Sequence, residues 1–462
     1  MLATAPFRLD ILTSDLNQDS LRLIEPTPGL TFAFLRGSGN AATPPAHLFG
    51  LGATGHEADE SDSVGDGNGD DGNAAPHLEV EETSLSGSVP TLRAHNRSKT
   101  DILIIAGQVL RGGKQNRGIN TDILIEAGKS AEIPVTCVEQ GRWSGSPRSR
   151  FHHAGVEPIF VRSAKMRDVH MSRRERASHA ANQGRVWSSI ADMQSAFGVA
   201  SPSSDMLQSL EAVKSRRLAV PRNTEDEHVS MMRLELVRLT EEVARIGRAL
   251  ARGMHSTAPT RAEHLSQRLS FLMEEIAFAR EQLIAAEQAA AARPPQGAAE
   301  PADAPIDFAE ADKAACDASG MLVFFKGEFL AGDVFADPQW FAKLYGDLRD
   351  SALASWLHLS RRGVRADPAA GDAGGGAHGQ VESAARSIVR DLAAGEWRER
   401  PVVAQGRGWL LEHPSIEGSV LAGSGDQALH LLVGTRNEPR VLSEAMRSSA
   451  AGRAMREDRP VR

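Results

Sequence analysis

The sequence predicts an α+β protein in which a β-rich core with peripheral helices is interrupted by an inserted antiparallel coiled-coil helical hairpin. Three observations lead to this prediction. Short apolar runs bounded by Gly, Pro and polar turns dominate residues 21–36 and 101–143, which is typical of strands. Apolar residues with helical spacing follow in residues 164–217. Two heptad stripes then run one after the other through residues 224–290.

Composition narrows the class of protein. The chain has 462 residues, of which 41% are hydrophobic and 24% are charged, as in an ordinary globular protein. The net charge of -8 argues against a nucleic-acid-binding surface. The two cysteines, Cys137 and Cys316, do not form a disulfide framework, so a reducing cytoplasm fits best. Neither a signal peptide nor a run of about 18 apolar residues is present, so no membrane attachment is expected.

Residues 1–222 are expected to form the N-terminal half of the core domain. "LRLIEPTPGLTFAFLR" at 21–36 predicts two short strands around a Pro-Gly turn. The acidic, Gly-rich segment 52–73 is nearly free of apolar residues, so we expect a disordered loop there. A strand resumes at "HLEVEE", before the densest β region begins.

That densest β region is residues 101–143. "DILIIAGQVL" is one apolar run, which predicts a single strand buried on both faces. "TDILIE" and "AEIPVTCVE" flank "AGKS" and predict a hairpin. The intervening "RGGKQNRGINT" is expected to be a loop with many polar side chains.

Two helices are predicted after this region. Val186, Ile190, Met193 and Phe197 have helical spacing, and Gly198 is a suitable helix stop. "SPSSDMLQSLEAVKSRR" predicts the start of a second helix after its proline.

Residues 223–292 differ in kind, because their apolar residues step alternately by three and four positions. The two stripes comprise Val229, Met232, Leu236, Leu239, Val243, Ile246 and Leu250, and then Leu265, Leu269, Leu272, Ile276, Ala279, Leu283 and Ala286. Capping-box signatures precede both stripes, Thr224 with Glu227 and Thr260 with Glu263. We therefore expect an antiparallel hairpin whose seam pairs with itself or with a second copy. A linker is expected at 293–306.

Residues 307–436 are expected to form the C-terminal half of the core domain. "GMLVFFKGEFLAGDVF" predicts two strands around Lys326-Gly327. Asp337 as N-cap and Pro338 at the first helical position predict the start of a long helix. A helix around "VESAARSIVRDLAA" and strands at "GSVLAG" and "ALHLLVG" complete this half, and residues 437–462 are expected to be a loose tail.

Two polar loops carry the candidate site. "RGGKQNRGINT" and "CVEQGRWSGSPRSR" bracket the predicted hairpin, so we expect them to meet at one edge of the sheet. Lys and Arg side chains bind phosphate or carboxylate groups, Arg with a planar fork. Amides recognise polar edges, and an indole stacks on a base or sugar. The predicted ligand-binding residues are Lys114, Gln115, Asn116, Arg117, Asn120, Gln140, Arg142 and Trp143.

Two further residues of these loops are candidates for catalysis. Glu139 offers a carboxylate as a general base. Cys137 offers a nucleophilic thiol whose pKa Arg142 would lower, with the histidines at 152–153 as the nearest bases. In the alternative interpretation, buried Arg and Glu satisfy one another and Cys137 is a small buried hydrophobe. The histidine pair lacks metal-ligand spacing to a carboxylate or thiol, so no metal site is predicted.

Residues 142–185 contain nine Arg and one Lys against three acidic residues. Such a local basic patch within an acidic protein predicts an anionic small molecule as partner. RNA is disfavoured, because no aromatic pattern of the kind that stacks on bases accompanies the patch. The alternative is a solvated helix surface.

The block "GGKQNRGINTDILIEAGKSAEIPVTCVEQGRW", followed by "SRF", "NQGRVW" and "GVASPSSDM", resembles the ARG and Rhodanese-Phosphatase-superfamily-associated Protein domain family. The resemblance covers residues 18–220 and 305–436, which makes 52–73 and 224–290 insertions. The family's name implies a role around NAD-derived or ADP-ribosyl metabolites, and the resemblance supplies no catalytic residue. Asn182 stands where the family pattern has an acidic residue.

These observations favour binding of an NAD-derived or ADP-ribosyl, nucleotide-like phosphorylated ligand, with processing of that ligand as an extension. A first alternative is a non-enzymatic assembly protein that works through its helical hairpin and self-associates through residues 224–290. A second alternative is a thiol-dependent sulfur-transfer enzyme that uses Cys137. The sequence identifies no cofactor.

Overall fold

The computed structural model describes two separate parts of the chain. The described residues are 5–9, 12, 20–37, 46–49, 78–84, 87–143, 150–199, 201, 203–218, 306–362, 364, 377–423 and 426–448, with single positions between 236 and 284. The acidic loop expected at 52–73 and most of the linker expected at 293–306 lie outside these residues. One compact unit combines Met1–Lys214 with Pro301–Arg462, and the other is Ser215–Glu300.

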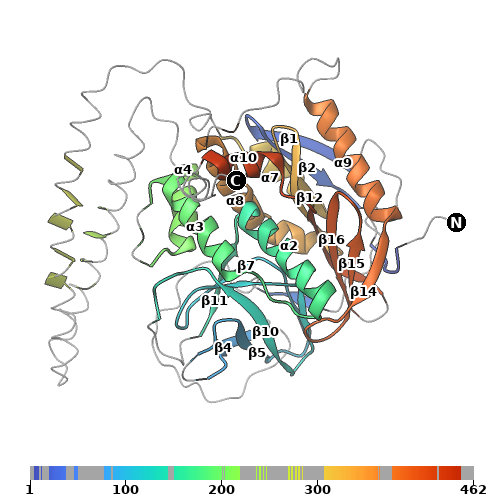
Figure 1. The fold of residues 1–462 in the computed structure, drawn as a ribbon, viewed down its shortest axis with the longest axis horizontal. Helices are drawn as coiled ribbons and strands as arrows, with labels where there is room; N and C mark the ends of the chain where they lie inside the picture. Colours follow the sequence, from blue (N-terminus) through green and yellow to red (C-terminus); the bar gives the residue numbers. More distant parts are fainter. Residues whose placement is uncertain are drawn as a thin grey trace, which may run out of the picture. The chain divides into compact units, whose positions relative to one another are not determined.

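An antiparallel eight-stranded sheet combines strands from both halves of the chain (Figure 1). Its strands in spatial order are β1 (Leu21–Thr27), β2 (Leu30–Leu35), β12 (Gly320–Phe325), β13 (Glu328–Phe335), β17 (Ala428–Thr435), β16 (Ile416–Ala422), β15 (Arg407–Glu412) and β14 (Glu396–Arg400). The predicted Pro-Gly turn joins β1 to β2, with Gly29 at a φ of 82°. The strand pair predicted around Lys326-Gly327 is β12 with β13.

Both faces of this sheet are buried, because its central strands are apolar at successive positions. In β2, Phe32 and Phe34 belong to a core that includes residues of α8 (Pro338–Arg361). Ala33 and Leu35, which point to the opposite face, belong to a second core with α9 (Ala377–Ala394). The sheet is therefore the central layer of the larger unit.

Two smaller sheets complete the β structure. The six-stranded antiparallel sheet has the order β11 (His152–Val156), β7 (Gln108–Arg111), β8 (Arg117–Ile119), β10 (Ser130–Cys137), β5 (Thr91–Asn96) and β4 (Leu78–Glu82). The three-stranded sheet has the order β3 (Ala46–Leu48), β6 (Asp101–Ile104) and β9 (Ile123–Ile125). The predicted α+β class with a β-rich core is confirmed.

Two predictions within residues 101–143 are wrong. The apolar run predicted as one strand is divided into β6 and β7, which lie in different sheets. The division falls at Gly107, whose φ of 86° favours glycine and whose missing Cβ leaves room for Arg162. The predicted hairpin does not form either, because β9 pairs with β6 whereas β10 pairs with β5 and β8.

Five further helices belong to the described part of this unit. They are α2 (Ile159–Arg176), α3 (Gln183–Phe197), α4 (Met206–Leu218), α7 (Ala309–Ala315) and α10 (Arg440–Ser448). The longest of them, α2, is largely buried. The predicted boundary signals act as expected, since Asp337 accepts a hydrogen bond from the Gln339 N–H at the start of α8 and Gly198 ends α3 with a φ of 65°. Among the described residues, no helix combines the length and the hydropathy needed to span a membrane.

The tail predicted to be loose from 437 onward begins with α10 instead. Val441, Leu442 and Ala445 are buried in the core that contains α8 residues. The carboxylate of Glu328 accepts hydrogen bonds from the first backbone N–H groups of this helix, at Arg440 and Val441. The few apolar residues of this nine-residue segment were too weak a signal to predict a helix.

A buried charge network ties α2 to two sheets. Arg162 donates to both oxygens of Asp333, and His430 lies between Asp333 Oδ1 (3.1 Å) and Asp122 Oδ2 (2.9 Å). All four side chains are buried. Burial alone would lower the pKa of His430, but the two carboxylates outweigh it and raise that pKa to about 9. The network therefore holds two positive and two negative charges.

In the unit Ser215–Glu300, every described residue of the predicted stripes is helical. These residues are Leu236, Leu239, Val243 and Ile246, and then Leu269, Leu272, Ile276, Ala279 and Leu283. Ile246, Leu272, Ile276 and Leu283 are buried. The antiparallel coiled-coil pairing of the two stripes stays a prediction.

Candidate functional site

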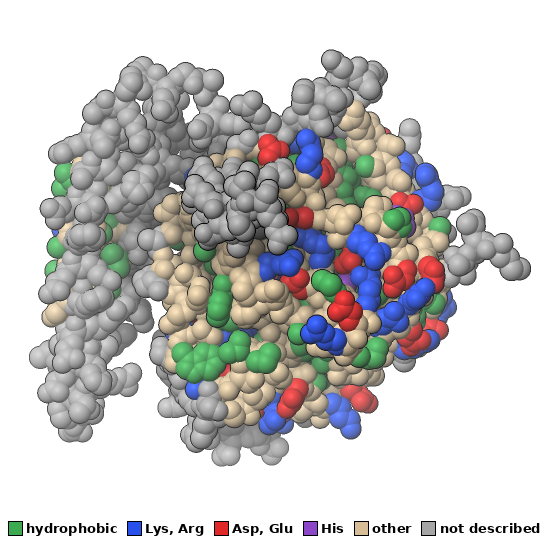
Figure 2. All heavy atoms as spheres, viewed as in Figure 1, with side chains coloured by type: hydrophobic (Ala, Val, Ile, Leu, Met, Phe, Trp, Pro, Cys, Tyr) green, Lys and Arg blue, Asp and Glu red, His purple; other side chains and the backbone are tan. Residues whose placement is uncertain are grey.

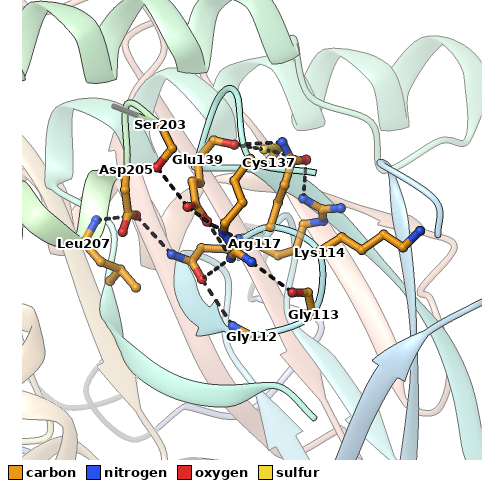
Figure 3. Close-up of polar contacts among 12 residues, drawn as sticks. Gly112, Gly113, Lys114, Arg117, Cys137, Glu139, Ser203, Asp205 and Leu207 are labelled. Carbon is orange, nitrogen blue, oxygen red and sulfur yellow. Dashed lines mark hydrogen bonds and ion pairs between the residues drawn. The ribbon is translucent and has the colours of Figure 1, made fainter. Parts of the chain in front are cut away.

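The two polar loops predicted to form the site do converge. β8 and β10 are antiparallel neighbours, and Arg117 is paired with Cys137 in their register. The loop before β8 therefore lies against the segment after β10, and the side chains of both meet in one cluster (Figure 3). The convergence comes from this pairing and not from the hairpin that the sequence predicts.

Glu139 is the centre of a saturated hydrogen-bond network. Its carboxylate accepts from Arg142 Nε (2.7 Å) and NH2 (2.6 Å), from the Asn116 N–H (3.0 Å) and from Ser203 Oγ (3.0 Å). Burial alone would raise the pKa of Glu139, but these hydrogen bonds outweigh it and lower that pKa. A carboxylate held by four donors is poorly placed to act as a general base. Arg142, in turn, binds Glu139 with Nε and NH2, two nitrogens of its planar guanidinium group.

Asn116 extends this network to a segment that the sequence analysis did not assign to the site. Its amide donates to Asp205 Oδ1 (3.1 Å), and its oxygen accepts from the Gly112 N–H (3.2 Å). Asp205 also accepts from the Leu207 N–H (3.0 Å), and its pKa is raised, chiefly by burial. We call Asn116, Glu139, Arg142, Ser203 and Asp205 the Glu139 network. The only sequence signal for its last two members was the block "GVASPSSDM".

Cys137 is a buried neutral thiol. Its Sγ donates to the Glu139 carbonyl (2.9 Å) and to Gln115 Oε1 (3.2 Å). Burial raises the pKa of this thiol, although Arg117 opposes the shift. The Gln183 side chain clamps the backbone on the other side, bonding both the N–H and the carbonyl of Cys137 at 2.8 Å. These contacts favour packing over nucleophilic catalysis.

The groups expected to activate Cys137 are engaged elsewhere. Arg142 binds Glu139, so Arg117 is the arginine that acts on the thiol most strongly. The ring of His153 is bonded to Asp347 Oδ2 (2.8 Å), and His152 is exposed on β11. The histidines were expected near the thiol because they are close to it in sequence. In the structure they lie on β11, an edge strand that β7 and β8 separate from β10.

Arg117 has unused hydrogen-bonding capacity. Its side chain is 0% exposed, and its NH1 donates to Gln115 Oε1 (2.9 Å). Its Nε and NH2 have no hydrogen-bond partner among the described residues, and the ion-pair distance from NH2 to Glu82 Oε1 is 4.0 Å. Burial lowers the pKa of Arg117. Trp143 is 46% exposed, with its ring centre 5.7 Å from the Arg117 guanidinium carbon and 5.4 Å from Lys114 Nζ.

We call Lys114, Arg117 and Trp143 the Arg117 cluster. In Figure 3 the Lys114 side chain extends away from the Glu139 network. The two other predicted ligand contacts, Asn120 and Gln140, differ in burial. Asn120 is buried and bonds Thr136 Oγ1 (2.6 Å) and the His179 carbonyl (3.0 Å), whereas Gln140 is exposed beside the loop.

Among the described residues of the basic stretch at 142–185, the basic side chains do not form one exposed patch. On α2, Arg162 donates to Asp333, Lys165 to Glu157 and Arg174 to Glu417, all inside the protein. Over the described part of the face in Figure 2, basic and acidic side chains are interspersed. A count of basic residues in the sequence does not show whether they lie on the surface. On α2, several of them are instead paired with acidic residues inside the protein.

Comparison with known proteins identifies one relationship. A family model described as ARG and Rhodanese-Phosphatase-superfamily-associated Protein domain matches residues 59–227 and 281–433. The gap between the two matched segments falls inside the insertion expected at 224–290. No curated protein and no solved structure matches the chain.

Proposed function

The chain belongs to the ARG and Rhodanese-Phosphatase-superfamily-associated Protein domain family, and from that premise we propose that it binds a nucleotide-like phosphorylated ligand of the NAD-derived or ADP-ribosyl class at the Arg117 cluster. The family description names ARG and rhodanese-phosphatase proteins, and the resemblance noted from the sequence implies a role around ADP-ribosyl metabolites. Binding is proposed without a reaction, because the acid–base candidate Glu139 is fully hydrogen-bonded and Cys137 carries its proton.

The observation that carries the proposal is the buried Arg117 guanidinium, two of whose nitrogens find no hydrogen-bond partner among the described residues. Leaving buried donors unsatisfied costs about 1–3 kcal/mol or more when the group is charged. An anionic group of a ligand would recover that free energy with charge-assisted hydrogen bonds. The half-exposed indole of Trp143 over the same guanidinium offers a flat surface for a base.

The ligand then has two recognisable parts. A phosphate oxygen accepts from Arg117, with the Lys114 ammonium as a second positive charge. A purine or nicotinamide ring stacks on Trp143. Because Arg117 is fully covered and Trp143 lies over it, the Trp143 side chain has to shift when the ligand enters. Ligand binding should therefore change the fluorescence of this tryptophan.

The test is a thermal-shift and fluorescence titration of the full chain with NAD, ADP-ribose, ADP, ribose 5-phosphate and adenosine. A ligand at a hundred times its dissociation constant stabilises by about 2.7 kcal/mol. We expect saturable stabilisation by ADP-ribose or ADP and none by adenosine, which lacks phosphate. In Trp143→Phe the stabilisation should persist in weaker form while the fluorescence change disappears.

Variants assign the binding to the cluster. Arg117→Met and Lys114→Gln should each weaken binding at least tenfold, about 1.4 kcal/mol. Arg93→Met, an exposed arginine on the neighbouring strand β5, is the control and should bind as the wild type does. A wild-type protein that no phosphorylated compound stabilises, or an Arg117→Met protein with unchanged affinity, would rule the proposal out.

A second candidate function is assembly through the unit Ser215–Glu300. Met273 and Ile284 are each 54% exposed on its helical positions, so they offer apolar surface that a second copy could cover. This candidate predicts that the chain self-associates and that Met273→Glu with Ile284→Glu disperses the assembly. Light scattering at several protein concentrations measures this, and a monomer at all of them would exclude self-association.

A further inference from the structure

Three arginines meet where α2 lies beside β14 and β15 (Figure 1). Arg173 and Arg174 come from the last turn of α2, and Arg400 ends β14. Arg174 is well neutralised, since its NH1 donates to Glu417 Oε1 (2.9 Å) and its Nε lies 3.5 Å from Glu412 Oε1. Arg400 shares the same Glu412 at 3.8 Å. Among the described residues, Glu417 and Glu412 therefore pair with Arg174 and Arg400, and neither pairs with Arg173.

Arg173 is the guanidinium left over. It is 5% exposed, and no carboxylate of the described residues lies within ion-pair distance of it. Its NH2 donates to the Pro401 carbonyl over a long 3.4 Å, and its Nε has no partner in the described part of the chain. The acid that acts on it most strongly is Asp122, which is already bonded to His430. Burial lowers the pKa of Arg173 to about 10.

Two more buried donors belong to the same place. Arg400 Nε and His179 Nδ1 also have no hydrogen-bond partner among the described residues. Burial and the neighbouring Arg173 lower the pKa of His179 to about 4, so its ring is neutral and its Nδ1 can carry a hydrogen. A Cβ on Gly408 would lie 3.2 Å from Arg173 NH2 and 3.5 Å from the Arg400 carbonyl, which shows how closely these elements approach.

We propose that Arg173, Arg400 and His179 bind a tetrahedral oxyanion, either free phosphate or the phosphate of a monoester, at a second site separate from the Arg117 cluster. A buried cation without a partner is strongly unfavourable, and an anion that accepts from it removes the penalty. Guanidinium groups suit this role because their N–H donors match the spacing of phosphate oxygens. The three donors come from a helix end, the following loop and a strand end.

The test is a titration of the full chain with inorganic phosphate and, in a second arm, with ribose 5-phosphate, followed by thermal shift. We expect saturable stabilisation of the wild type by at least one of them. Arg173→Met and Arg400→Gln should each weaken that binding at least tenfold. Without phosphate, Arg173→Met should melt no lower than the wild type, because the variant removes an uncompensated buried charge. A purely structural arginine would give a lower melting temperature.

Arg398→Gln is the matched control, since Arg398 lies two residues away on β14 and is 54% exposed. It should bind phosphate as the wild type does. Stabilisation by neither compound overturns the proposal, as does a pair of variants that bind like Arg398→Gln. Loss of the phosphate effect in Arg117→Met but not in Arg173→Met or Arg400→Gln also overturns it, because the anion would then belong to the Arg117 cluster. If Arg173→Met does not fold, Arg400→Gln decides the result.

Discussion

At the scale of single residues, Arg142 and Glu139 show how chemistry that suits a ligand can serve the framework. Arg142 binds Glu139 with two nitrogens and donates through NH1 to the Gly113 carbonyl at 3.0 Å. Glu139 in turn holds the loop at Asn116 and the segment at Ser203. We interpret the Glu139 network as the support that fixes the geometry of the neighbouring Arg117 cluster.

Replacing Arg142 by Lys should therefore reduce stability. Lysine keeps the charge but cannot span both oxygens of Glu139, so one carboxylate oxygen loses one of its two donors, a charge-assisted hydrogen bond. We expect the free energy of unfolding to fall by about 1–3 kcal/mol, measured by urea denaturation. The control is Arg97→Lys, because Arg97 makes an exposed pair with Glu79, and a surface pair contributes about 1 kcal/mol or less. Equal stability of Arg142→Lys and the wild type would contradict this role.

The two cysteines should differ sharply toward an alkylating reagent. Burial keeps the Cys137 thiol protonated, whereas Cys316 is exposed. Mass spectrometry after iodoacetamide treatment of the native protein should find one adduct, on Cys316. The second adduct should form only in denaturant. Rapid native labelling of Cys137 would instead revive the thiol-enzyme alternative.

At the scale of elements, local patterns predicted the pairs β1–β2 and β12–β13, which are joined by tight turns, but not the partners of β6, β9 and β10. Apolar runs marked β6, β7, β9 and β10, yet β6 and β7 join different sheets because the chain turns at Gly107 between them. Gly107 is visible in the sequence, but one reason for a glycine there is not. The Arg162 side chain of α2 occupies the space that a Cβ would need. The loop convergence was predicted correctly, whereas Ser203 and Asp205 were missed because tertiary packing alone brings them to the site.

Removal of the inserted unit tests its independence. Residues 215–300 form their own compact unit, and the described stripe positions in it are helical. We expect that replacing 226–289 by a short Gly/Ser linker leaves the rest of the chain folded, with a cooperative thermal transition near the wild-type temperature. Calorimetry measures this. If cooperative unfolding disappears, the unit contributes to the core of the larger one.

At the scale of the whole molecule, the Asp122–His430–Asp333–Arg162 network connects the two halves of the chain. Asp122 and Arg162 belong to the N-terminal half, and Asp333 and His430 to strands of the C-terminal half. Its charges are balanced, so loss of the His430 proton would leave excess negative charge in the interior. Such a change should be visible in the stability of the entire larger unit.

Stability should consequently decline at alkaline pH. A histidine with a folded pKa of about 9 stabilises the fold fully below its unfolded pKa of about 6.5, and this contribution is lost as the pH rises through about 9. The full loss is on the order of 3 kcal/mol. Urea denaturation between these pH values should show the decline in the wild type and in His378→Gln, whose histidine is 59% exposed. It should be much weaker in His430→Gln, and an equal slope in that variant would contradict the assignment.

The pairing of β2 with β12 also has a consequence for how the chain is made. β2 is synthesised before the inserted unit, but its hydrogen-bonding partner β12 is encoded after that unit. At about 5–20 residues per second, the intervening chain takes on the order of tens of seconds to emerge from the ribosome. During that time β2 presents an unpaired apolar edge, which is prone to aggregation. Nascent chains of this protein should therefore depend on a chaperone that shields β2 until the C-terminal half arrives.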